Sequence, residues 1–372
     1  MKRAILSFSV LLSVFSAVAQ QRHIAVANSL PVIRTELIEI SWSQLMEAYP
    51  KLDTGNFIVI NSLTKKELPF QLEFKGEKNV QQLLVQAAIP AKSTITLQLV
   101  KGKPKLIASK TFARHVPERK GDFAWENDRI AHRMYGQELQ KTPKEMAYGV
   151  DAWVKRTDSL VINKRYKLGN YHVDHGDGLD YYHVGLTLGA GGIAPYLNDT
   201  IWYAGTYSEW EILDTGPLRS RFRLRYDEWI AAGRRIKMTN TISIDAGSQL
   251  SRNEVKFETD GSLPVVAGII KRKEPGEMLL NEKDGLMAYW EPMHGPDGTT
   301  GVAVLFSTPV AQMMVKQGQL LAEGIVPDNE PFIYYNGAAW DKAGRIETAK
   351  DWFQYLQQFQ RQLNNRLSIT IK

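Results

Sequence analysis

The sequence predicts a mainly β protein, in which a small β module precedes a large antiparallel β-sandwich. Apolar and polar residues alternate in several stretches separated by Gly, Asp or Asn turns, as expected for half-buried strands joined by hairpins. Strands and helices do not alternate regularly along the chain, which disfavours a parallel, doubly wound sheet. Of the 372 residues, 44% are hydrophobic and 23% are charged. This composition is typical of a globular protein and excludes a disordered or fibrous chain.

The first 19 residues have the features of a secretory signal peptide. Lys2 and Arg3 precede the apolar run 4–14, and Ala17 and Ala19 form a small-x-small cleavage signature around Val18. We therefore expect the mature protein to be periplasmic or secreted. No cysteine follows the cleavage site, so a lipoprotein is not expected. No later run approaches about 20 apolar residues, so membrane insertion is not expected either.

The remaining chain is expected to form an N-terminal β module over 20–110 and a large β-sandwich catalytic domain over 111–372. Alternating residues predict a strand at 94–99 in the first part. They predict further strands at 221–226 and 367–371 in the second part.

One amphipathic helix is predicted near the C-terminus. Its apolar residues recur at helical spacing: Trp352, Tyr355, Leu356, Phe359 and Leu363. Thr348 and Asp351 have the spacing of a capping box, so the helix should begin after Thr348.

Charge and cysteine content limit the classes of function. The formal net charge is +6, and no dense basic run suggests nucleic-acid binding. A mild positive charge is compatible with an anionic small substrate. Because the chain contains no cysteine, disulfides, thiolate metal sites and cysteine nucleophiles are excluded. The sequence does not indicate an oligomeric state.

The most distinctive segment for chemistry is 171–183, which holds three of the seven histidines. Its titratable side chains are Tyr171, His172, Asp174, His175, Asp177, Asp180, Tyr181, Tyr182 and His183. Gly176 and Gly178 make a helix improbable, so we expect a loop or a bulged strand. Imidazoles, carboxylates and phenols crowded on a loop favour proton transfer near neutral pH. A solvated, histidine-rich turn is the structural alternative.

The same segment leaves a metal site open. Divalent metal ligands would be His172, His175, Asp177 and Asp180. The His-x-x-His spacing alone is a weak signal, and no cofactor is required. The following glycine run, 185–192, does not match a nucleotide-binding fingerprint.

A second group of polar and aromatic residues occupies 118–135. Trp125 is a candidate for stacking on a sugar ring, and Arg129 and Arg133 for pairing with a carboxylate or sulfate. Other candidate contacts to sugar hydroxyls or rings are Glu126, Asn127, His132 and Trp210. Further aromatic and acidic residues include Glu209, Glu211, Tyr289, Trp290, Glu291 and His294. A charged strand with internal ion pairs is the alternative for 118–135, and most aromatics in a sandwich are core residues.

The strings 116–131, 175–182 and 185–191 resemble a family of exported bacterial proteins from polysaccharide-utilisation gene clusters, known as a domain of unknown function. The resemblance extends over roughly 30–370. It implies a galactose-mutarotase-like β supersandwich and an oligosaccharide dehydratase activity on ulvan fragments. That activity removes water across C4 and C5 of a non-reducing-end glucuronate or iduronate and leaves a 4,5-unsaturated uronate.

A dehydratase of this kind needs a cation to neutralise the uronate carboxylate, a base for the C5 proton and an acid for the 4-hydroxyl. We expect Arg129, assisted by Asn127, to neutralise the carboxylate. The expected base is His175 or Tyr182, and the expected acid is His172 or His132, with Asp180 orienting a histidine. Three alternatives stay open. They are a mutarotase or epimerase of the same fold, a non-catalytic glycan-binding protein, and a two-carboxylate glycosidase using two of Glu126, Glu209, Glu211 and Glu291.

Overall fold

The computed structural model describes residues 22–327 and 330–372, so the expected signal peptide at 1–19 lies outside the described residues. The protein is mainly β, as predicted, and its strand ladders are antiparallel. An isolated parallel bridge joins Val150 to Gly189. None of the helices in the described ranges combines the length and apolar character needed to cross a bilayer.

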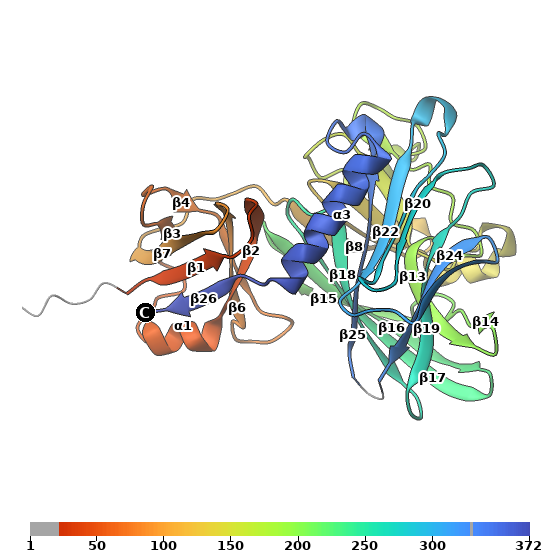
Figure 1. The fold of residues 1–372 in the computed structure, drawn as a ribbon, viewed down its shortest axis with the longest axis horizontal. Helices are drawn as coiled ribbons and strands as arrows, with labels where there is room; N and C mark the ends of the chain where they lie inside the picture. The colour runs from red at the N-terminus through yellow and green to blue at the C-terminus, as the bar shows by residue number, and fades with distance from the viewer. Residues whose placement is uncertain (1–21, 328–329) are drawn as a thin grey trace, which may run out of the picture.

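The N-terminal module contains two small sheets and one helix, seen at the left of Figure 1. One sheet has the order β26-β1-β7-β3-β4, with β1 (Ile24–Asn28), β3 (Phe57–Asn61), β4 (Glu67–Leu68), β7 (Ser93–Lys101) and β26 (Ser368–Ile371). The other has the order β2-β6-β5, with β2 (Arg34–Ser41), β5 (Phe70–Glu73) and β6 (Gln82–Ile89). Helix α1 (Trp42–Ala48) packs against this module through Leu45.

The C-terminal strand lies in this small module and not in the sandwich where we expected it. β26 pairs with β1, with Ile371 opposite Ile24 and Ile369 opposite Val26. Ile369 and Ile371 also pack against the apolar core of the module. The last strand therefore joins the first strand of the chain, which local alternation cannot predict.

The large part of the molecule contains three sheets. The first, β12-β11-β10-β9-β8, consists of β8 (Thr111–Val116), β9 (Asp122–Asn127), β10 (Ile130–Met134), β11 (Asp151–Lys155) and β12 (Gly178–Leu179). The second, β14-β13-β19-β24-β23, consists of β13 (Ala190–Leu197), β14 (Thr200–Ile201), β19 (Leu263–Ile270), β23 (Gln312–Lys316) and β24 (Gln319–Val326). The third has eight strands in the order β15-β16-β17-β18-β25-β22-β21-β20. They are β15 (Glu209–Asp214), β16 (Arg219–Ala231), β17 (Arg234–Asp245), β18 (Leu250–Glu258), β20 (Glu277–Asn281), β21 (Leu286–Trp290), β22 (Thr300–Phe306) and β25 (Phe332–Trp340).

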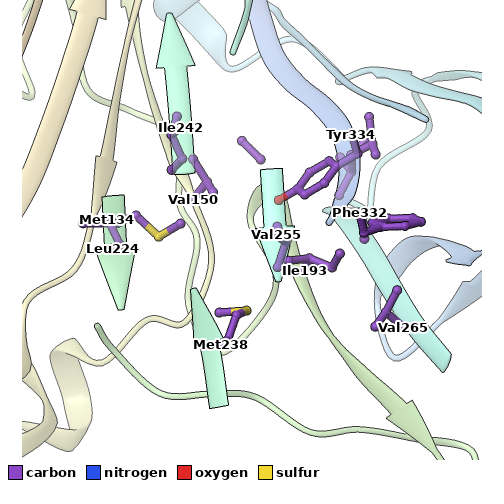
Figure 2. Close-up of a cluster of buried hydrophobic side chains, with 14 of the residues drawn as sticks. Met134, Val150, Ile193, Leu224, Met238, Ile242, Val255, Val265, Phe332 and Tyr334 are labelled. Atoms are coloured by element: carbon purple, nitrogen blue, oxygen red, sulfur yellow. The ribbon is translucent and has the colours of Figure 1, made fainter. Parts of the chain in front are cut away.

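The main hydrophobic core lies between the eight-stranded sheet and the other two large sheets. Figure 2 shows Met134 of β10 and Ile193 of β13 near Leu224, Met238 and Val255 of the eight-stranded sheet. β16 supplies this core through the alternation that the sequence predicted. Phe222, Leu224 and Tyr226 are buried, while the intervening arginines are only partly covered.

Helix α3 (Ala349–Asn364) confirms the predicted C-terminal helix. The Thr348 side chain accepts the Asp351 backbone N–H, as in a helix N-cap. Trp352 and Leu356 are buried against β21 and β22, so the apolar stripe fixes the helix to the sandwich. In Figure 1 the helix runs from the large part towards the N-terminal module and leads into β26. The remaining helices are α2 (Ile162–Leu168) and five short 3-10 turns at 117–119, 137–141, 143–145, 295–297 and 341–343.

Candidate functional site

The histidine-rich segment 171–183 is an irregular stretch that contains the short strand β12, in agreement with the predicted loop. One carboxylate oxygen of Asp174 accepts the backbone N–H groups of Gly176 and Gly178, at 2.8 and 2.9 Å. Gly178 has φ +100°, and a Cβ there would lie 2.2 Å from the Val154 carbonyl oxygen. Only glycine fits this contact, so the position of the segment on β11 depends on it.

A buried ionic cluster holds the segment to the first large sheet. The Arg133 guanidinium donates to Asp151 at 2.5 Å and to Asp180 at 3.2 Å, and Tyr171 Oη lies 3.4 Å away. These side chains are buried. Burial and the neighbouring Asp151 raise the pKa of Asp180 well above its usual value, against the opposing charge of Arg133. Burial also raises the pKa of Asp122, 3.7 Å from Arg133, to about 6.

His172 projects from this cluster towards solvent. Its Nδ1 lies 2.7 Å from the Asp180 carbonyl oxygen, and its ring centroid lies 4.6 Å from that of Tyr171. A carbonyl oxygen only accepts, so Nδ1 carries the hydrogen and the neutral ring keeps its lone pair on Nε2. The side chain is 64% exposed. His172 is therefore an oriented imidazole with a free basic nitrogen.

A second imidazole is held by a carboxylate and an arginine. Nε of Arg272 donates to Glu291 at 2.7 Å, and its Nη1 donates to the His183 carbonyl oxygen at 2.9 Å. The Arg272 guanidinium lies over the Tyr182 ring, 4.8 Å from its centroid. The other oxygen of Glu291 lies 3.2 Å from Nε2 of His294. Nη2 of Arg272 has no hydrogen-bond partner in the part of the chain that the structure describes.

These two arrangements meet along residues 180–183. His172 contacts Asp180, and the His294 ring lies edge-on to the ring of the next residue, Tyr181, with centroids 5.2 Å apart. Arg272 contacts the two residues after that. We call this arrangement the His172–His294 site, made of His172, Asp180, Tyr181, Tyr182, Arg272, Glu291 and His294. His172 is exposed and His294 is partly exposed, and each imidazole has a polar partner, the Asp180 carbonyl oxygen and Glu291 respectively.

Trp125 and Glu126 do not contribute to a surface as expected. Trp125 is fully buried in β9, and its Nε1 donates to Ser251 at 3.0 Å, so no sugar can stack on its ring. Glu126 is also fully buried, 2.7 Å from Lys155 Nζ, and accepts two backbone N–H groups from 161–162. Both side chains stabilise the fold.

Arg129 does not join the histidines, which corrects the expected grouping. It lies in the turn before β10, and its guanidinium donates to Asp158 at 2.9 Å. Arg133 lies about 13 Å further along the strand, from the usual rise per residue. Asn127 is buried and donates to the carbonyl oxygens of Asp245 and Ser248, so it braces a turn of the large sheet.

His132 is a buried structural residue and not an accessible acid. Its Nδ1 lies 3.1 Å from the Asp151 carbonyl oxygen, and burial lowers its pKa to about 4. The imidazole is therefore neutral near pH 7. Arg133 was expected to bind substrate, but its guanidinium donates hydrogen bonds to the buried carboxylates of Asp151 and Asp180.

The proposed metal ligands do not converge. His175 is exposed and bonds to the Asn170 carbonyl oxygen, while Asp177 pairs with Lys164 at 2.7 Å and lies 3.7 Å from Arg165. Among the residues that the structure describes, no group of three or more metal-ligating side chains is present.

Two other predicted residues have different surroundings from those expected. The Tyr182 hydroxyl is buried and donates to the Gly189 carbonyl oxygen at 3.0 Å, and burial raises its pKa well above the usual value. Tyr182 is thus a platform for Arg272 and not an available base. Trp210 is 43% exposed but stacks on His115, 5.1 Å between centroids, and not on the histidine-rich segment.

The sequence reasoning missed Arg272 as a site residue. Nothing in its local sequence distinguishes it from the other basic residues around 271–273. Glu291 and His294 had a visible signal, because they stand three residues apart after an aromatic pair at the end of β21. That spacing did not show which cation lies beside them.

Residues 26–369 match a family described as Domain of unknown function (DUF4861). The chain belongs to this family. A relative from Formosa agariphila, called Uncharacterized protein P7, is 32% identical over 389 residues, which cover 97% of each chain. The prediction that the chain belongs to a family described as a domain of unknown function is therefore confirmed, while the activity and gene-cluster context that the resemblance implies stay predictions.

Two solved structures match most of this chain. An alpha-mannosidase from Enterococcus faecalis V583 matches with TM-score 0.49 and 8% identity, over 94% of this chain and 46% of that one. A protein in the Glycosyl Hydrolase Family 38 from Enterococcus faecalis matches with TM-score 0.51 and 11% identity, over 94% and 47%. This chain spans about half the length of both proteins, and the second likeness shows a shared fold.

Proposed function

We propose that the protein is a carbohydrate-active lyase that removes water across C4 and C5 of a uronate at the non-reducing end of an ulvan-type oligosaccharide. The observation that carries the proposal is the pair of imidazoles, His172 and His294, that contact the consecutive residues Asp180 and Tyr181 beside Arg272. Membership of the family that the sequence resembled supports it. The fold shared with a protein of a glycosyl hydrolase family is compatible with a carbohydrate substrate.

The reaction begins at the carbon next to the carboxylate. Arg272 neutralises the carboxylate, so the C5 proton becomes acidic enough to leave. Nε2 of His172 takes this proton, and the C5–H electron pair forms the C4=C5 double bond. The C4–O4 bond breaks, and His294 protonates the departing oxygen to give water. Each imidazole is expected to contribute about 10²–10⁴-fold.

This assignment replaces Arg129 by Arg272 and places Glu291 as the residue that orients His294. Asp180 orients His172 through its carbonyl oxygen. No metal is needed in this scheme. We also propose that the fold is of the galactose-mutarotase-like supersandwich type and that the protein is exported by its N-terminal segment.

The test is mass spectrometry of glucuronate-terminated oligosaccharides after incubation with the enzyme. Loss of one water, together with new ultraviolet absorbance from the double bond, is expected. His172→Ala and His294→Ala should each lower the rate at least about 100-fold. His175→Ala is the matched control, because His175 is an exposed histidine of the same segment outside the site, and it should retain activity.

Other outcomes contradict the proposal in distinct ways. Gain of one water would identify a glycosidase, and an unchanged mass with a new isomer would identify an epimerase or mutarotase. Binding without any conversion would indicate a glycan-binding protein. A glycosidase is disfavoured by the carboxylates, since each one named for that role is paired. Glu126 pairs with Lys155, Glu209 and Glu211 with arginines of β16, and Glu291 with Arg272.

A further inference from the structure

A polar groove lies at the junction of the N-terminal module, helix α3 and the eight-stranded sheet. It consists of two cavities of about 420 and 400 Å³ that share much of their lining. Its walls include Glu36 of β2, Ser243 of β17, Arg252 of β18, Tyr335 of β25 and Gln362 of α3. We call it the junction groove. Figure 1 shows α3 crossing from the large part to the small module at this junction. No residue of the His172–His294 site lines it.

Ion pairs across the junction hold the walls of the groove in place. Arg219 of the large sheet pairs with Glu39 of the small module at 2.7 Å and with Asp245 of its own sheet at 2.6 Å. Arg34 of the small module donates to the carbonyl oxygens of Gln362 and Asn365 at the end of α3. The groove is therefore built by the fold. Its size and its place between two parts of a molecule are typical of small-ligand sites.

One buried hydroxyl in the groove lacks a partner. Ser243 is 4% exposed and lines both cavities, and its Oγ makes no hydrogen bond in the described part of the chain. Buried hydroxyls are normally satisfied, so this one is available to a ligand. Glu36, in the same walls, is partly buried, and burial raises its pKa.

The groove offers an aromatic wall beside planar polar groups. The ring of Tyr335 packs edge-on to Phe359, 5.3 Å between centroids, and both residues line the larger cavity. Gln358, Gln362 and Arg252 also line that cavity. Sugars are bound through such a combination, because a ring face packs on an aromatic side chain while the hydroxyls bond to amides and charged groups.

The second cavity adds positive charge. Lys75 and Arg366 line it, and neither makes an ion pair within residues 22–327 and 330–372. Lys75 lies close enough to Glu39 and Glu254 for its charge to act on them, but both carboxylates already pair with arginines, so Lys75 and Arg366 can face an anionic substituent. The acidic residues of the groove are already occupied, since Glu39 pairs with Arg219 and Glu254 pairs with Arg252.

We propose that the junction groove is a second binding site, for a mono- or disaccharide unit that carries a carboxylate. The sugar ring packs on Tyr335, a hydroxyl bonds to Ser243, and the carboxylate faces Lys75 and Arg366. This site does not depend on the proposed dehydration, because it shares no residue with the His172–His294 site. It would hold an acidic oligosaccharide at a distance from the bond that reacts.

The probes are cellobiouronic acid and cellobiose, which differ only by the carboxylate. Isothermal titration calorimetry is carried out on the full chain bearing His172→Ala and His294→Ala, so that no conversion occurs. Cellobiouronic acid should bind, and cellobiose should bind more weakly. Adding Lys75→Glu and Arg366→Glu together should lower the affinity for cellobiouronic acid by roughly tenfold or more, because charge-assisted contacts are lost.

The control is Arg361→Glu, which makes the same charge change as either groove substitution alone, at an exposed position of α3 outside the groove. It should leave the affinity unchanged. Ser243→Ala should lower the affinity for both probes. Equal affinity for the two probes, or no effect of the Lys75→Glu and Arg366→Glu pair, would overturn the groove proposal. Turnover by the wild type without groove binding overturns this inference alone, whereas groove binding without turnover overturns the proposed function alone.

Discussion

Nζ of Lys155 lies 2.7 Å from Oε2 of Glu126, and neither side chain is exposed to solvent. The pair joins β11 to β9, and Glu126 also fixes the start of α2 by accepting backbone N–H groups from Val161 and Ile162. Burial lowers the pKa of Lys155, against the opposing effect of Glu126. Glu126, which we expected to bind sugar hydroxyls, therefore holds β9, β11 and the start of α2 together.

Lys155→Met should lower the free energy of unfolding by about 3–5 kcal/mol, because it leaves the Glu126 carboxylate buried without its cation. Urea unfolding measures the change. The double variant Glu126→Gln with Lys155→Met is the control, since it removes both charges and should lose less than the single variant. If the double variant lost as much as Lys155→Met, the unpaired charge would not be the cause.

Buried His132 should make stability depend on pH. Its pKa of about 4 lies below the usual 6.5, so the folded protein excludes a proton that the unfolded chain accepts. The stabilisation from the neutral ring is complete above about pH 6.5 and is lost as the pH falls to about 4, on the order of 3 kcal/mol. His132→Asn lacks this dependence while it keeps a donor near the Asp151 carbonyl oxygen. The free energy of unfolding should therefore fall more steeply for the wild type than for His132→Asn between pH 7 and pH 4, and the two values should converge. An equal fall in both proteins would contradict the role of His132.

Gly178 should be far less tolerant of substitution than Gly176. Both have positive φ, +100° and +95°, but a Cβ at Gly178 meets the Val154 carbonyl oxygen at 2.2 Å, and a Cβ at Gly176 meets nothing within 4 Å. Gly176→Ala should cost about 1–2 kcal/mol from its backbone conformation alone. Gly178→Ala should cost more and should also lower the rate of dehydration, because it displaces Asp180. Thermal unfolding and the absorbance assay measure both effects, and equal losses in the two variants would contradict this account.

Arg272→Gln should lower kcat by about 10²–10³-fold if its charge faces the carboxylate as C5 loses its proton. The loss should be mainly in kcat, because the charge is needed most in the transition state. Lys273→Gln is the matched control, since Lys273 is the exposed cation next in the chain. Steady-state kinetics on a uronate-terminated oligosaccharide measures kcat and KM separately for the two variants and the wild type. A change in KM alone would assign Arg272 to binding.

The strands and the last helix could be predicted because their burial follows a local period. Phe222, Leu224 and Tyr226 alternate with arginines in β16, and Thr348 caps α3 as its spacing with Asp351 indicated. The histidine-rich loop was also visible, since its Asp-Gly pairs form the turns that hold it.

The site could be predicted only in part because β9 and β10 are buried throughout. Polar residues in a sequence suggest exposure, yet Glu126, His132 and Arg133 are buried with partners on another strand. A partner far along the chain leaves no local signal. The same reason hid Arg272, which meets the histidine-rich segment only after the second large sheet has formed.

The pairing of β1 with β26 has a consequence for how the polypeptide matures. β1 can pair early with β7 on one side, but β26, its partner on the other side, is synthesised only after the strands of the three large sheets. The sandwich strands can therefore pack while one edge of β1 in the small module is still unpaired. A chain that lacks β26 would leave this edge of β1 unpaired, and its free backbone groups could pair with a strand from another molecule.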